Sequence, residues 1–249
     1  MEERNTGLPA SIEAAWGRRD RPSRGPKPGL SLERIVDAAV RVAGSDGLEA
    51  VSMSRVAAEL GVSTMSLYRY VAAKDELLSL MVDAVMADAA PATESDRRDD
   101  EDWRTGLSRW AWAYHDILRR HPWVVRVPIT SPPVTPNLTA WLEHGLSTLR
   151  ATGLPEPEKL SVMLLLSGFV RNEATLVAEL GAAAEHEIMP SWGRVLGTLT
   201  DPEQFPALHA ALASEAFAQD DDPDAEFAFG LDRILDGVAA LVRTRTPRD

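Results

Sequence analysis

The sequence predicts an all-α fold, in which a small N-terminal helical unit is followed by a larger helical C-terminal domain. Apolar residues recur three or four positions apart through most of the 249 residues, which is the period of a helix. No segment of useful length alternates with the period of a strand. Clusters of Pro, Gly and Asp cut the chain into segments of helix length. We therefore expect an arm at residues 1–30, a first domain at residues 31–76 and a second domain at residues 77–249.

The composition is typical of a soluble protein from a reducing compartment. The chain has no Cys, which excludes disulfide scaffolds and Cys-ligated metal sites. The N-terminus lacks the apolar core of a signal peptide. The longest apolar run, Leu160 to Val170, is well short of the ~20 residues that a membrane span needs. We expect a cytoplasmic protein without membrane contact.

The net charge of −12 is unevenly distributed. Residues 1–74 carry 11 Lys and Arg against 9 Asp and Glu, whereas residues 75–249 carry 15 against 29. An acidic C-terminal part would be repelled by nucleic-acid phosphates, and ordinary solubilising charge explains the same excess equally well. The overall acidity therefore does not exclude a nucleic-acid-binding N-terminal part.

Residues 1–30 are rich in Pro, Gly and Arg, and we predict a flexible basic arm that buries nothing. Its basic residues are Arg18, Arg19, Arg21, Arg24 and Lys27, opposed locally by Asp20 alone. Such an arm can follow a phosphate backbone or enter a minor groove. A disordered tail with incidental charge is the alternative, and the position directly before the first domain favours contact.

The first domain contains two short helices joined by a tight turn. A preceding helix begins at Ser31 and ends at Asp46-Gly47. Ser52 is a suitable N-cap for the first short helix, and Gly61 stands where a left-handed C-cap ends it. Ser63 then caps the second short helix, which turns Leu67 and Val71 inward. This arrangement predicts a helix-turn-helix.

The outer face of the second short helix carries hydroxyls, aromatic rings and one Arg instead of Glu and Lys. Its residues are Thr64, Met65, Ser66, Tyr68, Arg69 and Tyr70. Such a face suits the major groove of DNA. Arg69 is suited to guanine and Met65 to a thymine methyl group. Ser52 and Ser54, at the start of the first short helix, can bind phosphate through hydroxyl and backbone N–H groups.

Two of these positions have strong alternatives. Tyr68 packs half-buried at the rim of the domain as readily as it contacts DNA. Arg55 lies four residues before Glu59, so a surface salt bridge is favoured over a DNA contact.

Roughly residues 31–88 resemble the N-terminal domain of the tetracycline-repressor (TetR) family of bacterial regulators. The resemblance depends on Asp46-Gly47-Leu48, the Ala-Ala-Glu-Leu-Gly-Val turn, Leu67-Tyr68 and Lys74 in this order. It implies that Thr64 to Tyr70 face the groove or its phosphates and that Lys74 grips the DNA backbone. It further implies a homodimer on palindromic operator DNA. The rest of the chain resembles the family's ligand-binding and dimerisation domain in length and helical pattern.

The second domain is predicted to consist of helices separated by Pro- and Gly-rich loops. Helices are expected from about Ala73 to Pro91, Trp103 to Arg120, Asn137 to Thr152, Glu156 to Glu185, Ala207 to Ala218 and from Asp224 to Arg245. Thr93 to Asp102 is the expected interdomain loop, and Met189 to Pro206 is expected to be irregular.

Two of these helices predict a dimer interface. The segment from Leu160 to Leu180 is apolar around much of its circumference, which indicates cover on two sides. The last helix carries an apolar face as well, from Phe227 to Val242. Packed against their symmetry mates, these two helices would form a four-helix interface. A monomer with a central buried helix is the alternative.

Aromatic and polar residues of the second domain predict a small-molecule site. The candidate ligand-binding residues are Trp110, Tyr114, Trp123, Trp141, His144, Met163, Phe169 and Asn172. Core packing is the favoured alternative for any single one of them, whereas the group as a whole supports a largely apolar ligand with a few orienting polar contacts.

The sequence offers no support for a cofactor, a metal site or catalysis. The five His lack ligand spacing, and no phosphate loop, nucleophile elbow or paired-carboxylate site occurs. We expect a DNA-binding transcriptional regulator that is not an enzyme, most simply a repressor released by a small apolar effector. The alternatives are a helix-turn-helix protein controlled by a partner protein and a helical binding protein without a small-molecule effector.

Overall fold

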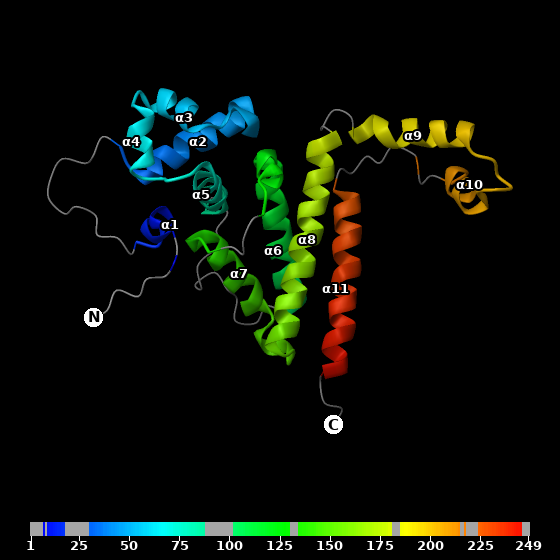
Figure 1. Cartoon of the computed structure of the whole chain (residues 1–249). Coiled ribbons are helices and arrows are strands. Elements are labelled where there is room, and N and C mark those ends of the chain that lie inside the picture. The colour runs from blue at the N-terminus through cyan, green and yellow to red at the C-terminus, as the bar shows by residue number, and fades with distance from the viewer. Residues whose placement is uncertain are drawn as a thin grey trace.

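The computed structural model describes residue 7 and residues 9–17, 30–87, 102–129, 134–180, 185–214, 217 and 224–245. Within these residues every regular element is helical, as the sequence predicts. Figure 1 shows a small N-terminal unit beside an upright bundle, in which α8 (Glu156–Leu180) and α11 (Ala225–Arg245) run side by side. A pair of helices, α9 (Glu185–Leu199) and α10 (Pro206–Leu212), projects to one side of that bundle.

The N-terminal unit consists of α2 (Leu32–Asp46), the short η1 (Leu48–Ala50), α3 (Met53–Leu60) and α4 (Thr64–Tyr68). The predicted caps at Ser31, Ser52 and Gly61 are confirmed, whereas Ser63 stands at the N-cap position of α4 without a cap hydrogen bond from its side chain, because its hydroxyl pairs with that of Ser66 at 2.9 Å. The hydroxyl of Ser31 accepts from the Arg34 N–H at 3.2 Å, and that of Ser52 accepts from the Arg55 N–H at 3.1 Å. Gly61 ends α3 with φ +67°, a left-handed conformation that other residues rarely adopt.

Helix α5 (Lys74–Ala87) connects the N-terminal unit to the bundle. It packs against α2 on one side and against α7 (Pro136–Thr148) on the other. Leu77 and Met81 are fully buried within it. One helix therefore contacts both parts of the chain.

The bundle is built around α8. This helix contacts α6 (Trp103–Arg120), η3 (Pro122–Arg126), α7 and α11, and η4 (Arg150–Thr152) follows α7. Asp102 caps α6 by accepting from the N–H groups of Arg104 at 2.9 Å and Thr105 at 3.1 Å. The hydrogen bond from the Thr105 hydroxyl is the largest cause that lowers the pKa of the Asp102 carboxyl, and the two backbone hydrogen bonds lower it further.

Among the described residues, α8 is the one helix that would cross a membrane by length and composition alone. Its side chains Val162, Met163, Leu166 and Val170 are buried inside the protein. Because α6, α7 and α11 all pack against it, we interpret its apolar composition as that of a bundle helix.

The prediction of an irregular segment from Met189 to Pro206 is wrong for residues 189–199, which belong to α9. A proline inside a helix removes one hydrogen bond and bends the axis, but it does not forbid helix on both sides. Beyond Pro190, Trp192, Val195 and Leu199 recur three or four residues apart and maintain the helical pattern.

A histidine fixes the turn between α9 and α10. His209 Nε2 lies 2.9 Å from the Thr200 hydroxyl and 3.2 Å from the Thr200 carbonyl oxygen. The Thr200 hydroxyl donates its own hydrogen to the Leu196 carbonyl at 2.7 Å, so it accepts from the ring nitrogen. His209 Nε2 therefore carries a hydrogen, and the two helices are held together at the turn.

The expectation that residues 1–30 bury nothing is wrong for α1 (Ala10–Ala15). Ser11 and Ile12 are 2% and 3% exposed, and α1 packs against α5. Burial of the Ile12 side chain contributes about 2 kcal/mol, and together with the hydrogen bonds of Ser11 and Trp16 it opposes the conformational entropy lost when this segment docks. The basic residues Arg18 to Lys27 lie outside the described part of the chain.

Candidate nucleic-acid interface and effector site

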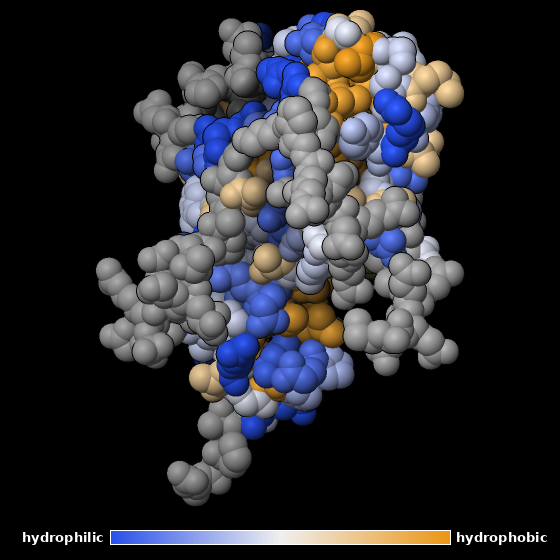
Figure 2. Space-filling model, turned by 90° about the vertical axis from the view of Figure 1, so that its left-hand side faces the viewer, coloured by the Kyte–Doolittle hydropathy of each residue, from blue (hydrophilic) through white to orange (hydrophobic). Residues whose placement is uncertain are grey.

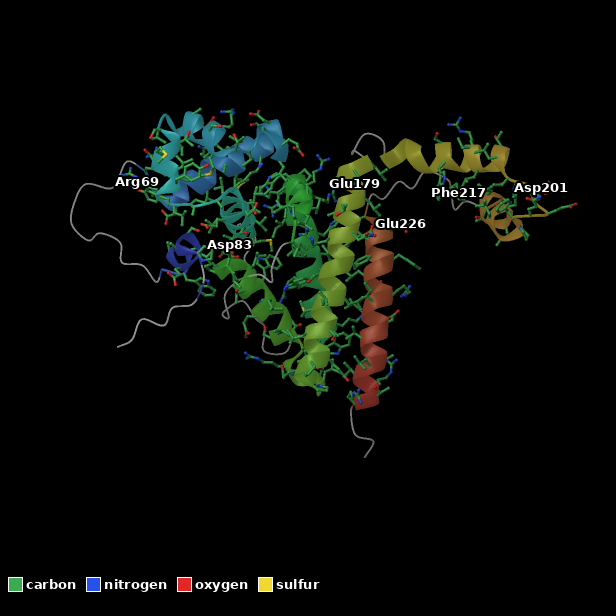
Figure 3. All side chains as sticks on the ribbon, viewed as in Figure 1. Arg69, Asp83, Glu179, Asp201, Phe217 and Glu226 are labelled. Carbon is green, nitrogen blue, oxygen red and sulfur yellow. The ribbon has the colours of Figure 1, made fainter. Side chains whose placement is uncertain are left out.

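The outer face of α4 is exposed, as a DNA-contacting face requires. Met65 and Tyr68 are 74% and 46% exposed, and Arg69 is exposed in the turn that follows. Figure 3 shows Arg69 at the outer edge of the N-terminal unit. Thr64 and Ser66 are half-buried beside them, while Leu67 is fully buried and anchors the helix. In the view of Figure 2, this upper part of the molecule mixes hydrophilic and apolar surface.

The predicted phosphate contacts lie around this face at helix starts. The Ser52 hydroxyl caps α3 and lies 3.2 Å from the exposed Ser54 hydroxyl. Lys74 is exposed and is the first residue of α5. The N-terminus of α3 and the Lys74 ammonium group thus offer positive charge next to α4.

Tyr70 has a structural partner that the sequence did not predict. Its hydroxyl donates to the Leu30 carbonyl oxygen at 3.0 Å, and its ring is half-buried. This contact ties the end of the α4 turn to Leu30, which precedes the N-cap residue of α2. Tyr70 therefore has a packing role, whatever contact it makes with DNA.

The prediction that Arg55 forms a surface ion pair is confirmed. Its guanidinium group lies 3.1 Å from Glu59 and 3.0 Å from Asp46. The hydrogen bond from Arg55, followed by one from Ser45, holds the pKa of Asp46 below its usual value. Because Arg55 is engaged on its own domain, Arg69 and Lys74 are the better candidates for DNA contacts.

Four of the predicted ligand-binding residues form one buried cluster between α6, α7 and α8. The ring centroids of Trp110, Tyr114 and Trp141 are 5.4 to 6.0 Å apart. Met163 fills the space next to Gly145, where even a Cβ atom would lie only 2.1 Å from its Cε. We call Trp110, Tyr114, Trp141 and Met163 the aromatic cluster. All four side chains are at least nine-tenths buried.

Hydrogen bonds connect the aromatic cluster to α5. Trp110 Nε1 donates to the Trp141 carbonyl oxygen at 3.0 Å. Trp141 Nε1 donates in turn to the Met86 carbonyl oxygen at 2.8 Å. Met86 is near the end of α5, so this hydrogen bond joins the aromatic cluster to the helix that enters the N-terminal unit.

The other four predicted ligand-binding residues lie on η3, α7 and α8, outside the aromatic cluster. Phe169 stacks on Phe227 of α11, with centroids 5.4 Å apart, instead of joining the aromatic cluster. His144 is half-buried on α7, and Asn172 is exposed on α8. Trp123 is 5% exposed in η3, and its indole nitrogen has no hydrogen-bond partner among the described residues. The spacing of apolar residues did not predict which of these side chains join the aromatic cluster, because it does not determine which helix packs against each face.

Two residues that the sequence analysis did not select have clear roles. His115 is 5% exposed and stacks on Phe227 with centroids 4.1 Å apart. Burial, and then the charge of Arg119, lowers the pKa of His115, so the ring is neutral at neutral pH. Asp83 is a buried carboxylate between α5 and α7, labelled in Figure 3. Its sequence signal was a single acid in the apolar stretch of α5.

Among the described residues, no three His, Asp or Glu side chains lie close enough together to hold a metal ion.

Sequence comparisons match both parts of the chain to one family. Residues 35–81 match the profile described as bacterial regulatory proteins of the tetR family. Residues 96–242 match the profile of the tetracyclin repressor-like C-terminal domain. The HTH-type transcriptional repressor DrrR1 of Streptomyces coeruleorubidus is 40% identical over 94% of this chain and 87% of its own length.

Solved structures show the same relationship. Apo ActR from Streptomyces coelicolor is 26% identical, with a TM-score of 0.73, over 89% of this chain and all of that one. ActR in complex with actinorhodin is 27% identical, also with a TM-score of 0.73, over 86% of this chain and 97% of that one. With a helix-turn-helix unit, an exposed α4 face and a helical second domain, the chain belongs to the TetR family of DNA-binding transcriptional regulators.

Proposed function

We propose that the chain is a cytoplasmic repressor that binds palindromic operator DNA as a homodimer and leaves it when a small, largely apolar effector binds. The observation that carries this proposal is the hydrogen-bonded path from the aromatic cluster through Trp141 to Met86 of α5. A ligand that separates the rings changes the position of α5, and α5 carries the DNA-binding unit.

The DNA-binding unit comprises residues 31–76, and its contacts are divided between base edges and phosphates. Arg69 and Met65 are exposed far enough to reach base edges. Lys74 and the α3 N-terminus at Ser52 and Ser54 contact phosphates. Thr64, Ser66, Tyr68 and Tyr70 complete the contact face.

A homodimer would cover apolar side chains that the single chain leaves exposed on α8 and α11. Leu164, Leu165 and Phe229 are 76%, 55% and 62% exposed. On α9, Trp192 and Leu199 are 50% and 76% exposed on the side arm that projects beyond α11 in Figure 1. Exposed apolar side chains on adjacent long helices favour a protein interface.

The effector site lies at the aromatic cluster within residues 77–249. The solved complex of ActR with actinorhodin supports a small-molecule site in a protein of this fold. In this chain the site is closed by its own side chains, so the effector displaces the tip of Met163, the flexible member of the cluster. The Trp123 indole N–H, which has no hydrogen-bond partner among the described residues, is a candidate donor to a ligand that extends from the aromatic cluster to η3. The half-buried His144 of α7 is a second candidate polar contact.

The second candidate function is a regulator controlled by a partner protein. It is favoured by the exposed apolar residues of the α9–α10 arm, since such a surface can receive a protein instead of a second copy. The two candidates differ in what changes the operator affinity: a small molecule in the first, a protein in the second.

The test begins with operator DNA selected from a random duplex library. A panel of aromatic and aliphatic compounds is then titrated against protein and protein–operator complex, with tryptophan fluorescence and operator affinity recorded together. We expect at least one compound to quench or shift the fluorescence and to release the operator. Met163→Ala should change the affinity for that compound, whereas the exposed control Leu199→Ala should not. If no compound releases the operator and a solution structure shows the rings packed together, control by a partner protein is the remaining alternative.

A further inference from the structure

Helix α1 lies outside both segments that the family profiles match, 35–81 and 96–242. It nevertheless docks at the junction between the DNA-binding unit and the bundle, beside α5 and near α7 in Figure 1. It is held there by contacts to both parts of the chain.

The contact of α1 with the DNA-binding unit is made at the first turn of α5. The Ser11 hydroxyl, 2% exposed, donates to Glu76 Oε2 at 2.5 Å. The same oxygen accepts from the backbone N–H of Ala72 at 3.2 Å. Ala72 lies in the connection between α4 and α5, two residues before Lys74. Ser11 therefore ties α1 to the connection between α4, the proposed recognition helix, and α5.

The contact of α1 with the bundle is made at the entrance of α7. Trp16 Nε1 donates to the Val134 carbonyl oxygen at 2.7 Å. Val134 directly precedes Thr135, the N-cap residue of α7. Between these two hydrogen bonds, Ile12 is 3% exposed and supplies an apolar anchor.

We infer that Ser11, Ile12 and Trp16 are positioning residues for operator binding, and that α1 is a brace holding the DNA-binding unit at a fixed angle to the bundle. This inference rests on the proposed homodimer. Two recognition helices must be about 34 Å apart to enter successive major grooves. If the DNA-binding unit of each subunit rotates relative to its bundle, the separation of the two recognition helices changes. The affinity for a complete operator therefore depends on the brace, whereas the affinity for one half-site does not.

A purely stabilising role for α1 makes a different prediction. Loss of fold stability lowers the fraction of active protein and weakens binding to every DNA by one common factor. Loss of positioning lowers only the gain in affinity that a second half-site provides. This gain depends on the effective concentration of the second DNA-binding unit at its half-site. The ratio of full-operator to half-site affinity therefore separates the two roles.

The experiment measures both affinities for the full-length wild type and for Ser11→Ala, Ile12→Asp and Trp16→Phe, with Ile12→Val as the matched control. The probes are the operator selected by the wild type and a duplex of equal length with one half-site scrambled. We expect the affinity ratio to fall on the order of tenfold in Ile12→Asp, and less in the two variants that each lose one hydrogen bond. Half-site affinity should stay constant, and Ile12→Val should match the wild type.

A spectroscopic measurement supports the affinities. Because the chain has no Cys, a single Asp37→Cys substitution on the exposed side of α2 accepts one spin label per subunit. The distribution of label-to-label distances should broaden in Ile12→Asp and not in Ile12→Val.

The outcomes separate the inference from the function on which it rests. If the wild type binds the full operator no more tightly than the half-site duplex, or gives no label-to-label distance, the proposed homodimer is rejected. If the wild type prefers the full operator but the variants keep the wild-type affinity ratio and the wild-type width of the distance distribution, the brace hypothesis is wrong. An equal loss on both DNAs overturns it as well, in favour of plain stabilisation.

Discussion

Asp83 of α5 caps helix α7 by accepting the backbone N–H groups of Asn137 at 2.9 Å and Leu138 at 3.1 Å. The Asn137 side-chain amide adds donations to Asp83 Oδ2 at 3.0 Å and to the Asp83 carbonyl oxygen at 3.1 Å. Thr135 stands at the N-cap position, but its hydroxyl is buried and has no hydrogen-bond partner among the described residues. The cap of α7 is thus supplied from α5, and the two helices are fastened together.

Replacing Asp83 should loosen this junction. Asp83→Ala leaves two helix N–H groups without their acceptor and removes one of the two acceptors of the Asn137 amide, which keeps the backbone carbonyl of residue 83. This loss should lower the free energy of unfolding by about 3 kcal/mol. Asp83→Asn keeps the shape and one acceptor oxygen and should cost about half as much. Urea denaturation followed by circular dichroism measures both values. Equal stabilities for wild type and Asp83→Ala would refute the cap.

Trp141→Phe tests the link between the aromatic cluster and α5. The substitution removes the indole N–H and leaves the buried Met86 carbonyl oxygen unsatisfied, a cost of about 1–3 kcal/mol. Because Trp141 also belongs to the aromatic cluster, the effector affinity is measured separately, and we expect the ratio of operator affinities without effector and with saturating effector to fall. Trp192→Phe, at a half-exposed residue of α9, is the control. An unchanged ratio in Trp141→Phe would mean that the signal takes another route.

The dimer interface is tested by charges at two neighbouring positions of α8. Leu164 is 76% exposed in the single chain, so Leu164→Asp should leave the fold intact and raise the dimer dissociation constant by on the order of 100-fold. Leu166 is 1% exposed, so Leu166→Asp should unfold the protein instead. Light scattering and circular dichroism distinguish these outcomes. A folded Leu164→Asp dimer of wild-type affinity would exclude this face.

Glu173 makes stability depend on pH. Burial, followed by the charge of Glu226, raises the pKa of Glu173 above its usual value. The folded state therefore holds this proton more tightly than the unfolded state, and stability is lost as the pH rises through the raised value. Glu173→Gln should raise Tm at pH 7 and should bring little gain below about pH 4, where the carboxyl is protonated. Melting curves across this range provide the test, with the exposed Glu179→Gln as control.

The local parts of the fold were predictable from sequence because caps and apolar spacing act over a few residues. Ser31, Ser52 and Gly61 mark helix ends through contacts with their immediate neighbours. The docking of Ile12 was not predictable in this way, since its partner helix α5 lies more than 60 residues further along the chain.

The candidate effector site was predicted only in part, for a similar reason. Trp110, Tyr114, Trp141 and Met163 do meet, but Phe169 turns to Phe227 on a helix far along the sequence. The role of Asp83 depends on the entrance of α7, more than 50 residues away. A spacing rule detects one face of one helix, and it contains no information about which helix will cover this face.

Selection of DNA from a random duplex library tests the central claim most directly. The wild type should enrich an inverted repeat whose half-site centres are about one helical turn, roughly 34 Å, apart. Arg69→Ala should relax the preference at particular base pairs by about 1–3 kcal/mol, whereas Lys74→Ala should weaken binding to all sequences by one factor. An unenriched library, or an Arg69→Ala profile identical to that of the wild type, would contradict operator recognition through α4.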